Sequence, residues 1–300
     1  MYICVHEKER PEWMVVMRRW KVCPGDVDSG SEEVKTMSQD AVIGIIGGQG
    51  WMGRALGMAL LERNVVSPER LVISSRSSRG EAYRNWPGVR CVKDNRELVA
   101  LADVVVLSVR PEDLASLEVE LDDKLVISLL AMAPSQEIAN QLGSRRVVRA
   151  MPNAAAEIRR AYFPWFASPQ VSVADKRLVQ ALLASCGTAR ELPTERDLDY
   201  LTALSGAGPA YPALLAQSML EHARGAGLSE EIAREAVMQT LVGGSLLLET
   251  LGTEPGDMVE RLIAYDGTTA KGLRTMMDEG IVQAIHRGLD AAHRAAISPP

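Results

Sequence analysis

Aromatic residues are scarce in this chain of 300 residues, since Phe, Trp and Tyr together make up only 4% of it. Hydrophobic residues of all kinds nevertheless reach 47%, so Leu, Val, Ile, Ala and Met must build the core. A chain of this length typically forms about two domains.

The chain also lacks an excess of positive charge, because its formal net charge is −6. A general nucleic-acid or membrane-surface binder needs a broad basic face. No apolar run approaches the roughly 20 residues of a transmembrane helix, and the N-terminus lacks the apolar core of a secretion signal. We therefore expect a cytoplasmic protein without nucleic-acid or membrane partners. A local basic pocket for an anionic cofactor stays compatible with this charge.

Cysteines are few and scattered, at Cys4, Cys23, Cys91 and Cys186, with no CxxC pair and no cluster of cysteines and histidines. This spacing argues against a disulfide framework and against a zinc site. We expect reduced thiols and no metal.

Residues 1–40 are polar and interrupted by Pro and Gly, unlike the rest of the chain. Such a composition predicts a poorly ordered extension. Met37 stands just before the first apolar segment, so we keep it beside Met1 as an alternative start of translation.

From residue 41 to about 193, short apolar segments alternate with amphipathic ones. This alternation predicts a parallel sheet covered on both faces by helices, with ligands bound at the carboxyl ends of the strands. The expected strands lie at 41–46, 70–76, 103–109, 124–131 and 146–152, and the expected helices at 52–65, 96–102, 112–121 and 135–143.

Residues 194–300 show helical periodicity without strand signals, in segments 209–227, 229–252 and 268–296. Several of these helices are apolar nearly all round, and a domain of this size cannot hide them alone. We therefore expect an all-helical second domain that buries its apolar faces against another copy, giving at least a dimer.

A glycine-rich loop follows the first apolar segment. Gly48, Gly50 and Gly53 fit G-x-G-x-x-G, with Gly47 just ahead, between an expected strand and an expected helix. In this motif the first glycine makes the turn, the second admits the pyrophosphate, and the third lets helix and strand pack closely. The alternative is a purely structural turn. The candidate cofactor contacts in the loop are Gly48, Gln49, Gly50, Trp51, Met52 and Gly53.

The second strand ends in S-S-R-S-S-R at residues 74–79, without the acidic residue that holds a ribose 2′-hydroxyl in NAD enzymes. Ser75, Arg76 and Ser77 suit a 2′-phosphate instead, through charge-assisted hydrogen bonds. We favour NADPH, with NADH as the alternative cofactor and a solvated serine-rich turn as the alternative structure.

Three segments, T-A-L-S-G-A-G-P-A-Y at 202–211, D-G-T-T-A-K-G-L at 266–273 and R-V-V-R-A-M-P-N at 146–153, resemble the pyrroline-5-carboxylate reductase family. A-D-V-V-V-L-S-V-R-P-E-D-L at 102–114 is similar to that family's strand and A-V-K-P turn. The resemblance covers about residues 42–296 and identifies a divergent member. It implies an N-terminal Rossmann domain, an interlocking helical dimerisation domain, and reduction of the C=N bond of 1-pyrroline-5-carboxylate to proline with NAD(P)H.

The resemblance also implies roles for residues. Residues 267–269 would hold the substrate carboxylate, since N–H groups at the start of a helix bind anions. Residues 205–208 would shape the site beside the nicotinamide. Thr268 and Ser205 are the catalytic candidates. The substrate-binding candidates are Asp266, Gly267, Thr268, Thr269, Gly206 and Gly208, and the further cofactor candidates are Val109, Arg110, Pro111, Pro152 and Asn153.

This sequence departs from the family in and beside the expected pocket. M-P-N-T-P becomes M-P-N with Ala154 and Ala155, and the residues before Gly267 are Ala264, Tyr265 and Asp266. Asp266 would repel a carboxylate unless it points away or pairs with a cation such as Lys271, and a substrate carrying an amine could use it.

Alternative functions stay open at this point. One is a reductase of a different cyclic or linear imine carboxylate, and another is a non-catalytic nucleotide-binding homologue. A 3-hydroxy acid dehydrogenase would need a lysine on the helix after the Rossmann domain, and the chain has none between Lys176 and Lys271.

Overall fold

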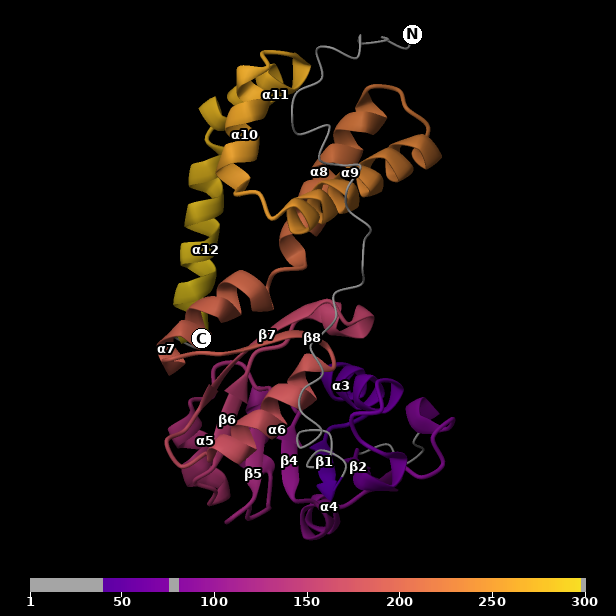
Figure 1. Ribbon diagram of the computed structural model, residues 1–300, viewed down its shortest axis with the longest axis vertical. Coiled ribbons are helices and arrows are strands. Elements are labelled where there is room, and N and C mark those ends of the chain that lie inside the picture. The colour runs from indigo at the N-terminus through magenta and orange to yellow at the C-terminus, as the bar shows by residue number, and fades with distance from the viewer. Residues whose placement is uncertain (1–39, 76–80, 298–300) are drawn as a thin grey trace.

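The computed structural model describes residues 40–75 and 81–297, and its α/β part is followed by a helical part that extends away from it (Figure 1). The extension predicted for residues 1–40 lies outside the described residues, apart from Asp40. Among the described residues, no helix is both long and apolar enough to cross a membrane.

The strands form one sheet in the order β3-β2-β1-β4-β5-β6-β7-β8. All neighbouring pairs are parallel except β6 and β7. The predicted parallel α/β part is therefore confirmed, with one antiparallel pair that was not predicted. The strands are β1 Ile43–Ile46, β2 Leu71–Ser74, β3 Arg90–Val92, β4 Val104–Leu107, β5 Leu125–Ser128, β6 Val147–Ala150, β7 Ala161–Ala167 and β8 Gly187–Glu191.

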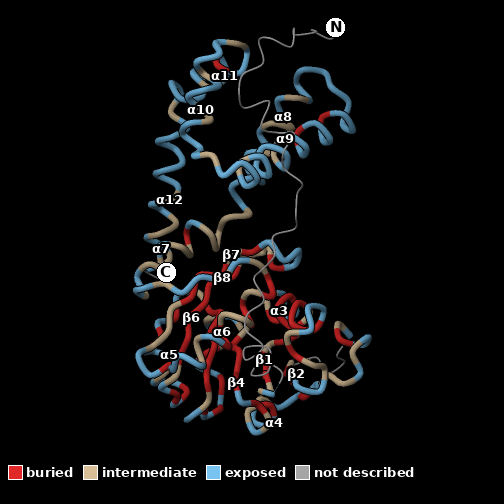
Figure 2. Tube along the Cα trace, viewed as in Figure 1, coloured by how far each residue is buried: buried red, intermediate tan, exposed pale blue. Residues whose placement is uncertain are grey.

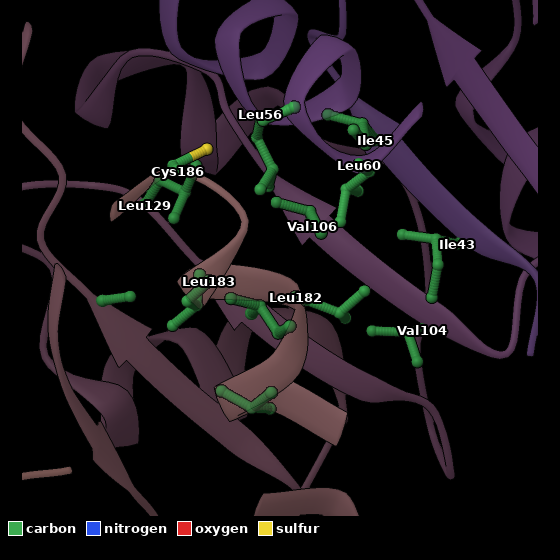
Figure 3. Packing of buried hydrophobic residues seen from close by; sticks show 14 of the residues in the cluster. Ile43, Ile45, Leu56, Leu60, Val104, Val106, Leu129, Leu182, Leu183 and Cys186 are labelled. Atoms are coloured by element: carbon green, nitrogen blue, oxygen red, sulfur yellow. The ribbon is translucent and has the colours of Figure 1, made fainter. Parts of the chain in front are cut away.

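Helices cover both faces of the sheet, which explains why the central strands are apolar at nearly every position. On one face, α3 (Trp51–Glu62) and α6 (Val173–Ala184) pack on β1 and β4, as Figure 3 shows for Leu56 and Leu182. On the other face, α4 (Asn95–Leu101) and α5 (Ser135–Leu142) bury side chains such as Leu98 against the sheet. Successive strand residues point to opposite faces, so each face receives its own apolar cluster.

Four elements of the α/β part were not predicted, namely β3, β7, α6 and β8. The helix predicted for 112–121 is wrong, because only a 3-10 helix, η4 (Pro111–Ser116), forms there. After it, Leu117, Val119 and Leu121 are buried in alternation with exposed glutamates, which is the pattern of extended chain. The other 3-10 helices are η2 Pro68–Arg70, η3 Glu81–Tyr83 and η5 Ala154–Ile158.

The helical part begins with α7, directly after the boundary that we place between residues 193 and 194. The single helix predicted for 268–296 is instead two helices, separated by Gly280 with φ +86°. Among the elements, α8 packs on α9, α10 packs on α11, and α12 reaches back to α7 and η6. The elements are α7 Glu195–Leu201, the π-helical turn η6 Thr202–Gly206, α8 Ala210–Gly225, α9 Glu230–Leu251, α10 Pro255–Ala264, α11 Thr268–Asp278 and α12 Ile281–Ile297.

The helical part has almost no core within one chain. No residue of α8, α10 or α12 is buried, and Figure 2 shows the contrast between this part and the buried sheet. Large apolar side chains such as Leu214, Val242 and Leu246 are 45% to 65% exposed. Such a surface fits burial against a second copy of the chain.

Candidate active site

A cleft of about 910 Å³ lies where β1, β2, β4 and β5 end. Parallel α/β sheets bind ligands at this edge, at the point where the strand order reverses. Here the order reverses between β1 and β4, which are neighbours in the sheet although β2 and β3 separate them in the sequence. The residues that line the cleft include Gly47, Gln49, Gly50, Trp51, Met52, Ser74, Ser75, Lys93, Asn95, Ser108, Val109, Arg110 and Leu129.

One glycine of the loop has a different role from the one that the motif assigned to it. The turn is made at Gly47, whose φ is +80°, and not at Gly48. A Cβ on Gly48 would lie 2.7 Å from the Ile73 side chain of β2, and a Cβ on Gly53 would lie 2.6 Å from the Gly47 carbonyl oxygen. Gly48 and Gly53 therefore permit close packing. A Cβ on Gly50 would meet only backbone oxygens, at 3.1 Å or more.

The N-terminus of α3 has the features of an anion site. Its N-cap, Gly50, provides no side-chain hydrogen bond, and the first turn contains no acidic residue. The first N–H groups of a helix have no acceptor within the helix, and those of Trp51 and Met52 belong to residues that line the cleft. These donors and the helix dipole suit a pyrophosphate. The chain's residues therefore fit a dinucleotide.

Tyr83 supports the glycine loop through its hydroxyl group, and no sequence motif identified this residue. Its buried hydroxyl donates to the carbonyl oxygen of Gly48 at 2.9 Å and lies 3.4 Å from that of Gly53. Burial raises the pKa of Tyr83 well above its usual value, so this hydroxyl stays a donor. A Cβ on Gly57 would lie 2.3 Å from the same hydroxyl oxygen. Glycine is therefore needed at this position for α3 to pack so closely on Tyr83.

One side of the cleft lies at the end of β2, where Rossmann folds hold the ribose of the adenosine. Gln49 donates through Nε2 to Oγ of Ser75 at 3.0 Å, and Ser74 donates through Oγ to Oδ1 of Asn95 at 2.7 Å. Ser75, one of the three predicted phosphate contacts, lines the cleft. The other two predicted phosphate contacts, Arg76 and Ser77, lie outside the described residues.

The turn after β4 forms the opposite wall of the cleft. Val109 and Arg110 line it, and Pro111 begins η4 immediately behind. The guanidinium of Arg110 lies 3.8 Å from the carboxylate of Glu112, and both side chains are mostly exposed. An exposed pair of this kind leaves Arg110 able to face an anionic ligand, because its attraction is weak in water.

The segment after β6 joins the sheet to the helical part. Asn153 donates through Nδ2 to the Ser205 carbonyl oxygen at 2.8 Å and accepts from the Ala155 N–H at 2.9 Å. A Cβ on Gly206 would lie 3.2 Å from Cγ of Met151, so these two segments are in close contact. The structure therefore brings the predicted residues of 152–153 and 205–206 together.

Ser205 and Gly208 have local roles in the π-helical turn. The Ser205 hydroxyl donates to the Leu201 carbonyl oxygen at 2.9 Å. A Cβ on Gly208 would lie 2.9 Å from the Ser205 carbonyl oxygen, so glycine is needed for the tight exit toward α8. Tyr211 closes the same turn by donating to the Ala203 carbonyl oxygen.

Residues 266–269 lie far from the cleft of their own chain, at the end of the helical part opposite the sheet (Figure 1). Asp266 has φ +53° and pairs with Arg274 at 2.5 Å, so the cation that offsets its charge is Arg274 rather than the Lys271 named from the sequence. Gly267 is the N-cap of α11 without a side-chain cap, and the first turn has no acidic residue. The N-terminus of α11, with Thr268 and Thr269, is a second place suited to an anion.

A buried charge network, also missed from the sequence, ties α7 to the sheet. Arg149 of β6 is 2% exposed and donates to Glu195 at 2.7 Å and to Asp199 at 3.3 Å. Glu195 also accepts from the N–H and the hydroxyl of Ser135, at 2.7 and 2.8 Å. Burial alone raises the pKa of Glu195, but these hydrogen bonds outweigh it and hold that pKa below its usual range. The available signal was a charged residue inside an apolar strand.

Comparisons with known proteins cover both parts of the chain. A family model described as pyrroline-5-carboxylate reductase dimerisation matches residues 195–298, and one described as NADP oxidoreductase coenzyme F420-dependent matches residues 42–132. Pyrroline-5-carboxylate reductase 2 of Bacillus subtilis is 32% identical over 262 residues, which cover 85% of this chain and 94% of the relative. The Pseudomonas aeruginosa pyrroline-5-carboxylate reductase is 35% identical over 207 residues, covering 67% and 76%.

A solved structure gives the same result for the fold. The crystal structure of Plasmodium falciparum pyrroline carboxylate reductase with NADP bound matches with a TM-score of 0.75 and 25% identity, covering 86% of this chain and 98% of that one. The likeness thus extends over the sheet, the cleft and the helical part, and it confirms the resemblance found in the sequence. The chain belongs to the pyrroline-5-carboxylate reductase family and carries that family's dimerisation domain.

Proposed function

We propose that the protein reduces the C=N bond of 1-pyrroline-5-carboxylate to give proline, with NADPH as the cofactor. The observation that carries this proposal is the identity of 32% over 262 residues with a pyrroline-5-carboxylate reductase. That match covers 85% of this chain, and the dimerisation family model covers residues 195–298, which include the start of α11.

The dinucleotide is held by the cleft at the strand ends. The N–H groups at the start of α3, following Gly50, bind the pyrophosphate, and Ser75 lies on the adenosine side. Val109 and Arg110 lie along the opposite wall, toward the nicotinamide. When bound, NADPH supplies the hydride that reduces the imine carbon. The protein's contribution is chiefly to hold the ring and the imine at reacting distance.

Asn153 orients the nicotinamide end of the cleft. Both polar atoms of its amide are used, on the Ser205 carbonyl oxygen and the Ala155 N–H. The side chain therefore fixes the π-helical turn against the strand end and shapes the place where the imine lies.

The substrate carboxylate binds at the N-terminus of α11, on the uncapped N–H groups after Gly267 and on the hydroxyls of Thr268 and Thr269. No intrachain hydrogen bond of either hydroxyl occurs among the described residues, so both are able to donate. Ser205 is less suited to donate, because its hydroxyl already bonds to Leu201. We retain Thr268 as the better catalytic candidate.

The two halves of the site come from two subunits. In one chain α11 lies at the end of the helical part away from the sheet (Figure 1), whereas the cleft lies at the edge of the sheet. The dimerisation domain brings a second chain to the first. In the assembled dimer, residues 267–269 of one subunit complete the cleft of the other.

Initial rates of NADPH oxidation test the proposed reaction. We expect turnover with 1-pyrroline-5-carboxylate, slower turnover with its six-membered homologue, and weaker use of NADH. Turnover of the six-membered imine alone would show that the substrate is a different imine carboxylate. NADPH binding without turnover of either imine would support a nucleotide-binding homologue.

Mixed dimers test the shared site. Asn153→Ala damages the cleft and Thr268→Val damages the α11 end, and each variant alone is expected to be inactive. Mixing them with subunit exchange should restore about one quarter of the wild-type activity, because half of the dimers carry one intact site of two. A site contained within one chain would give no restoration.

A further inference from the structure

Lys93 is a cation in the dinucleotide cleft that no motif identified. It follows β3, which lies outside β2 in the sheet order, and its side chain is exposed. It lines the cleft together with Ser74, Ser75 and Asn95. The end of β3 therefore borders the adenosine side of the cleft, away from the turn after β4.

The neighbouring cations are already paired. Arg90 bonds to Glu97 at 2.7 Å and Arg96 bonds to Glu118 at 3.1 Å. For Lys93, the described part of the chain offers no ion pair or hydrogen bond to the ammonium group. An unpaired ammonium inside a cleft suits an anionic group of a ligand.

Asn95 adds a neutral donor beside Lys93. Its Oδ1 accepts the hydroxyl hydrogen of Ser74, which orients the amide. The Nδ2 group then has no protein acceptor among the described residues. Lys93 and Asn95 thus both line the cleft near the end of β2, where the ribose of the adenosine lies in Rossmann folds.

We infer that Lys93, assisted by Asn95, binds the 2′-phosphate of NADPH and selects it over NADH. The inference rests on the proposed function for the identity of the cofactor. The pyrophosphate has its own site at the N-terminus of α3, on the other side of β2, so it does not need Lys93. The 2′-phosphate is the anionic group in which NADPH differs from NADH.

Equilibrium binding to the whole protein, without any imine, tests the inference. In Lys93→Met, the dissociation constant of NADPH is expected to rise about 10-fold, while that of NADH stays within about 2-fold. Adenosine 2′,5′-bisphosphate should lose affinity like NADPH, and ADP should behave like NADH. Added salt should weaken NADPH binding to the wild type more than to the variant, because exposed charges are screened.

Arg96→Met is the matched control. It removes a cation three residues away that is paired with Glu118 and does not line the cleft, so it should leave the NADPH-to-NADH preference unchanged. Lys93→Arg should keep most of the preference.

Loss of NADPH and NADH affinity to the same extent in Lys93→Met, or no loss of either, would overturn the inference. A wild-type protein that binds neither dinucleotide would overturn both the inference and the proposed cofactor. Tight NADPH binding without imine turnover would contradict the proposed reaction alone.

Discussion

At the scale of single residues, Tyr83 shows how one hydroxyl supports the cofactor loop. The bond to the Gly48 carbonyl oxygen is buried, so its removal leaves an acceptor without a partner. Tyr83→Phe is expected to lower the free energy of unfolding by about 1–2 kcal/mol and to weaken NADPH binding several-fold.

Urea unfolding and equilibrium binding check this prediction. Tyr162→Phe is the control, because Tyr162 of β7 makes no side-chain hydrogen bond among the described residues. Equal behaviour of the two variants would show that the hydroxyl of Tyr83 does not support the loop.

Asp266 places a negative charge where the family pattern has none, and an ion pair with a neighbouring arginine offsets this charge. Its carboxylate pairs with Arg274 at 2.5 Å, and both side chains are about half or more exposed. Asn also tolerates positive φ, so Asp266→Asn keeps the backbone. We expect less than about 1 kcal/mol of destabilisation and a change in the imine KM of less than about 3-fold. A larger fall in KM would restore Asp266 as a group that repels the substrate carboxylate.

Motif residues of the cleft could be predicted because they are adjacent in sequence. Gly50 and Val109 belong to short segments that follow strands, and strand ends meet at one edge of the sheet. Tyr83 and Lys93 belong to no segment of this kind, and only the fold brings them to the loop and the cleft. The separation of Thr268 from the cleft was equally invisible, because periodicity does not show which chain completes a site.

At the scale of elements, substitutions in the glycine loop distinguish an effect on folding from an effect on cofactor binding. Gly50 has extended backbone with φ −66°, which alanine adopts readily. Gly50→Ala is therefore expected to change the melting temperature little while weakening NADPH binding at least about 10-fold, since its methyl group enters the pyrophosphate site.

Gly48→Ala is the comparison for that variant. Its methyl group would collide with Ile73, so we expect loss of stability together with loss of binding. Thermal unfolding and NADPH titration distinguish the two. A Gly50→Ala protein that binds NADPH like the wild type would contradict the assignment of the pyrophosphate site.

The buried charge network between α7 and the sheet predicts that the stability of the fold depends on pH. The pKa of Glu195 lies below its usual range in the folded chain. Such a carboxyl stabilises the fold above its unfolded pKa of about 4.3, and the stabilisation is lost as the pH falls through the lower folded pKa. Glu195→Gln should therefore lose less stability than the wild type between neutral pH and about pH 3.

Urea unfolding at both pH values measures this difference. Glu118→Gln is the control, because Glu118 is 83% exposed in its pair with Arg96. If Glu195→Gln lost as much stability at low pH as the wild type, the charge network would not be the cause of the acid sensitivity.

The five central strands were predictable from their apolar runs, whereas β7, which contains Pro164, and the edge strands were not. Strand β3 has one buried residue of three, and β8 has none, so neither carries a hydrophobic pattern. In the stretch after η4, apolar residues alternate with glutamates at 117–121, and this signal for extended chain was misread as helical. Local pattern thus identified the sheet's centre, and tertiary contacts decided its edges.

At the scale of the whole molecule, the exposed helices of the dimerisation domain fit burial against another copy of the chain. Leu246 of α9 is 45% exposed in one chain. Leu246→Glu is expected to shift the protein toward monomers and to abolish imine turnover, because a charge cannot be buried unpaired in an interface. NADPH binding to the cleft should remain, since the cleft lies within one chain.

Sedimentation or light scattering, combined with NADPH titration, checks the state of this variant. Gln141→Glu introduces the same charge on the exposed surface of the α/β part and should leave the dimer intact. A monomeric protein that still reduces the imine would contradict the two-subunit site.

The most direct test of the account is product formation by the wild-type protein supplied with 1-pyrroline-5-carboxylate and NADPH. Proline and oxidised cofactor are to be quantified together over the course of the reaction. We expect one proline for each NADPH oxidised by the wild type, neither product in the Thr268→Val variant, and less of both products in the Gly50→Ala variant at limiting NADPH. Tight NADPH binding without proline formation by the wild-type protein would contradict it.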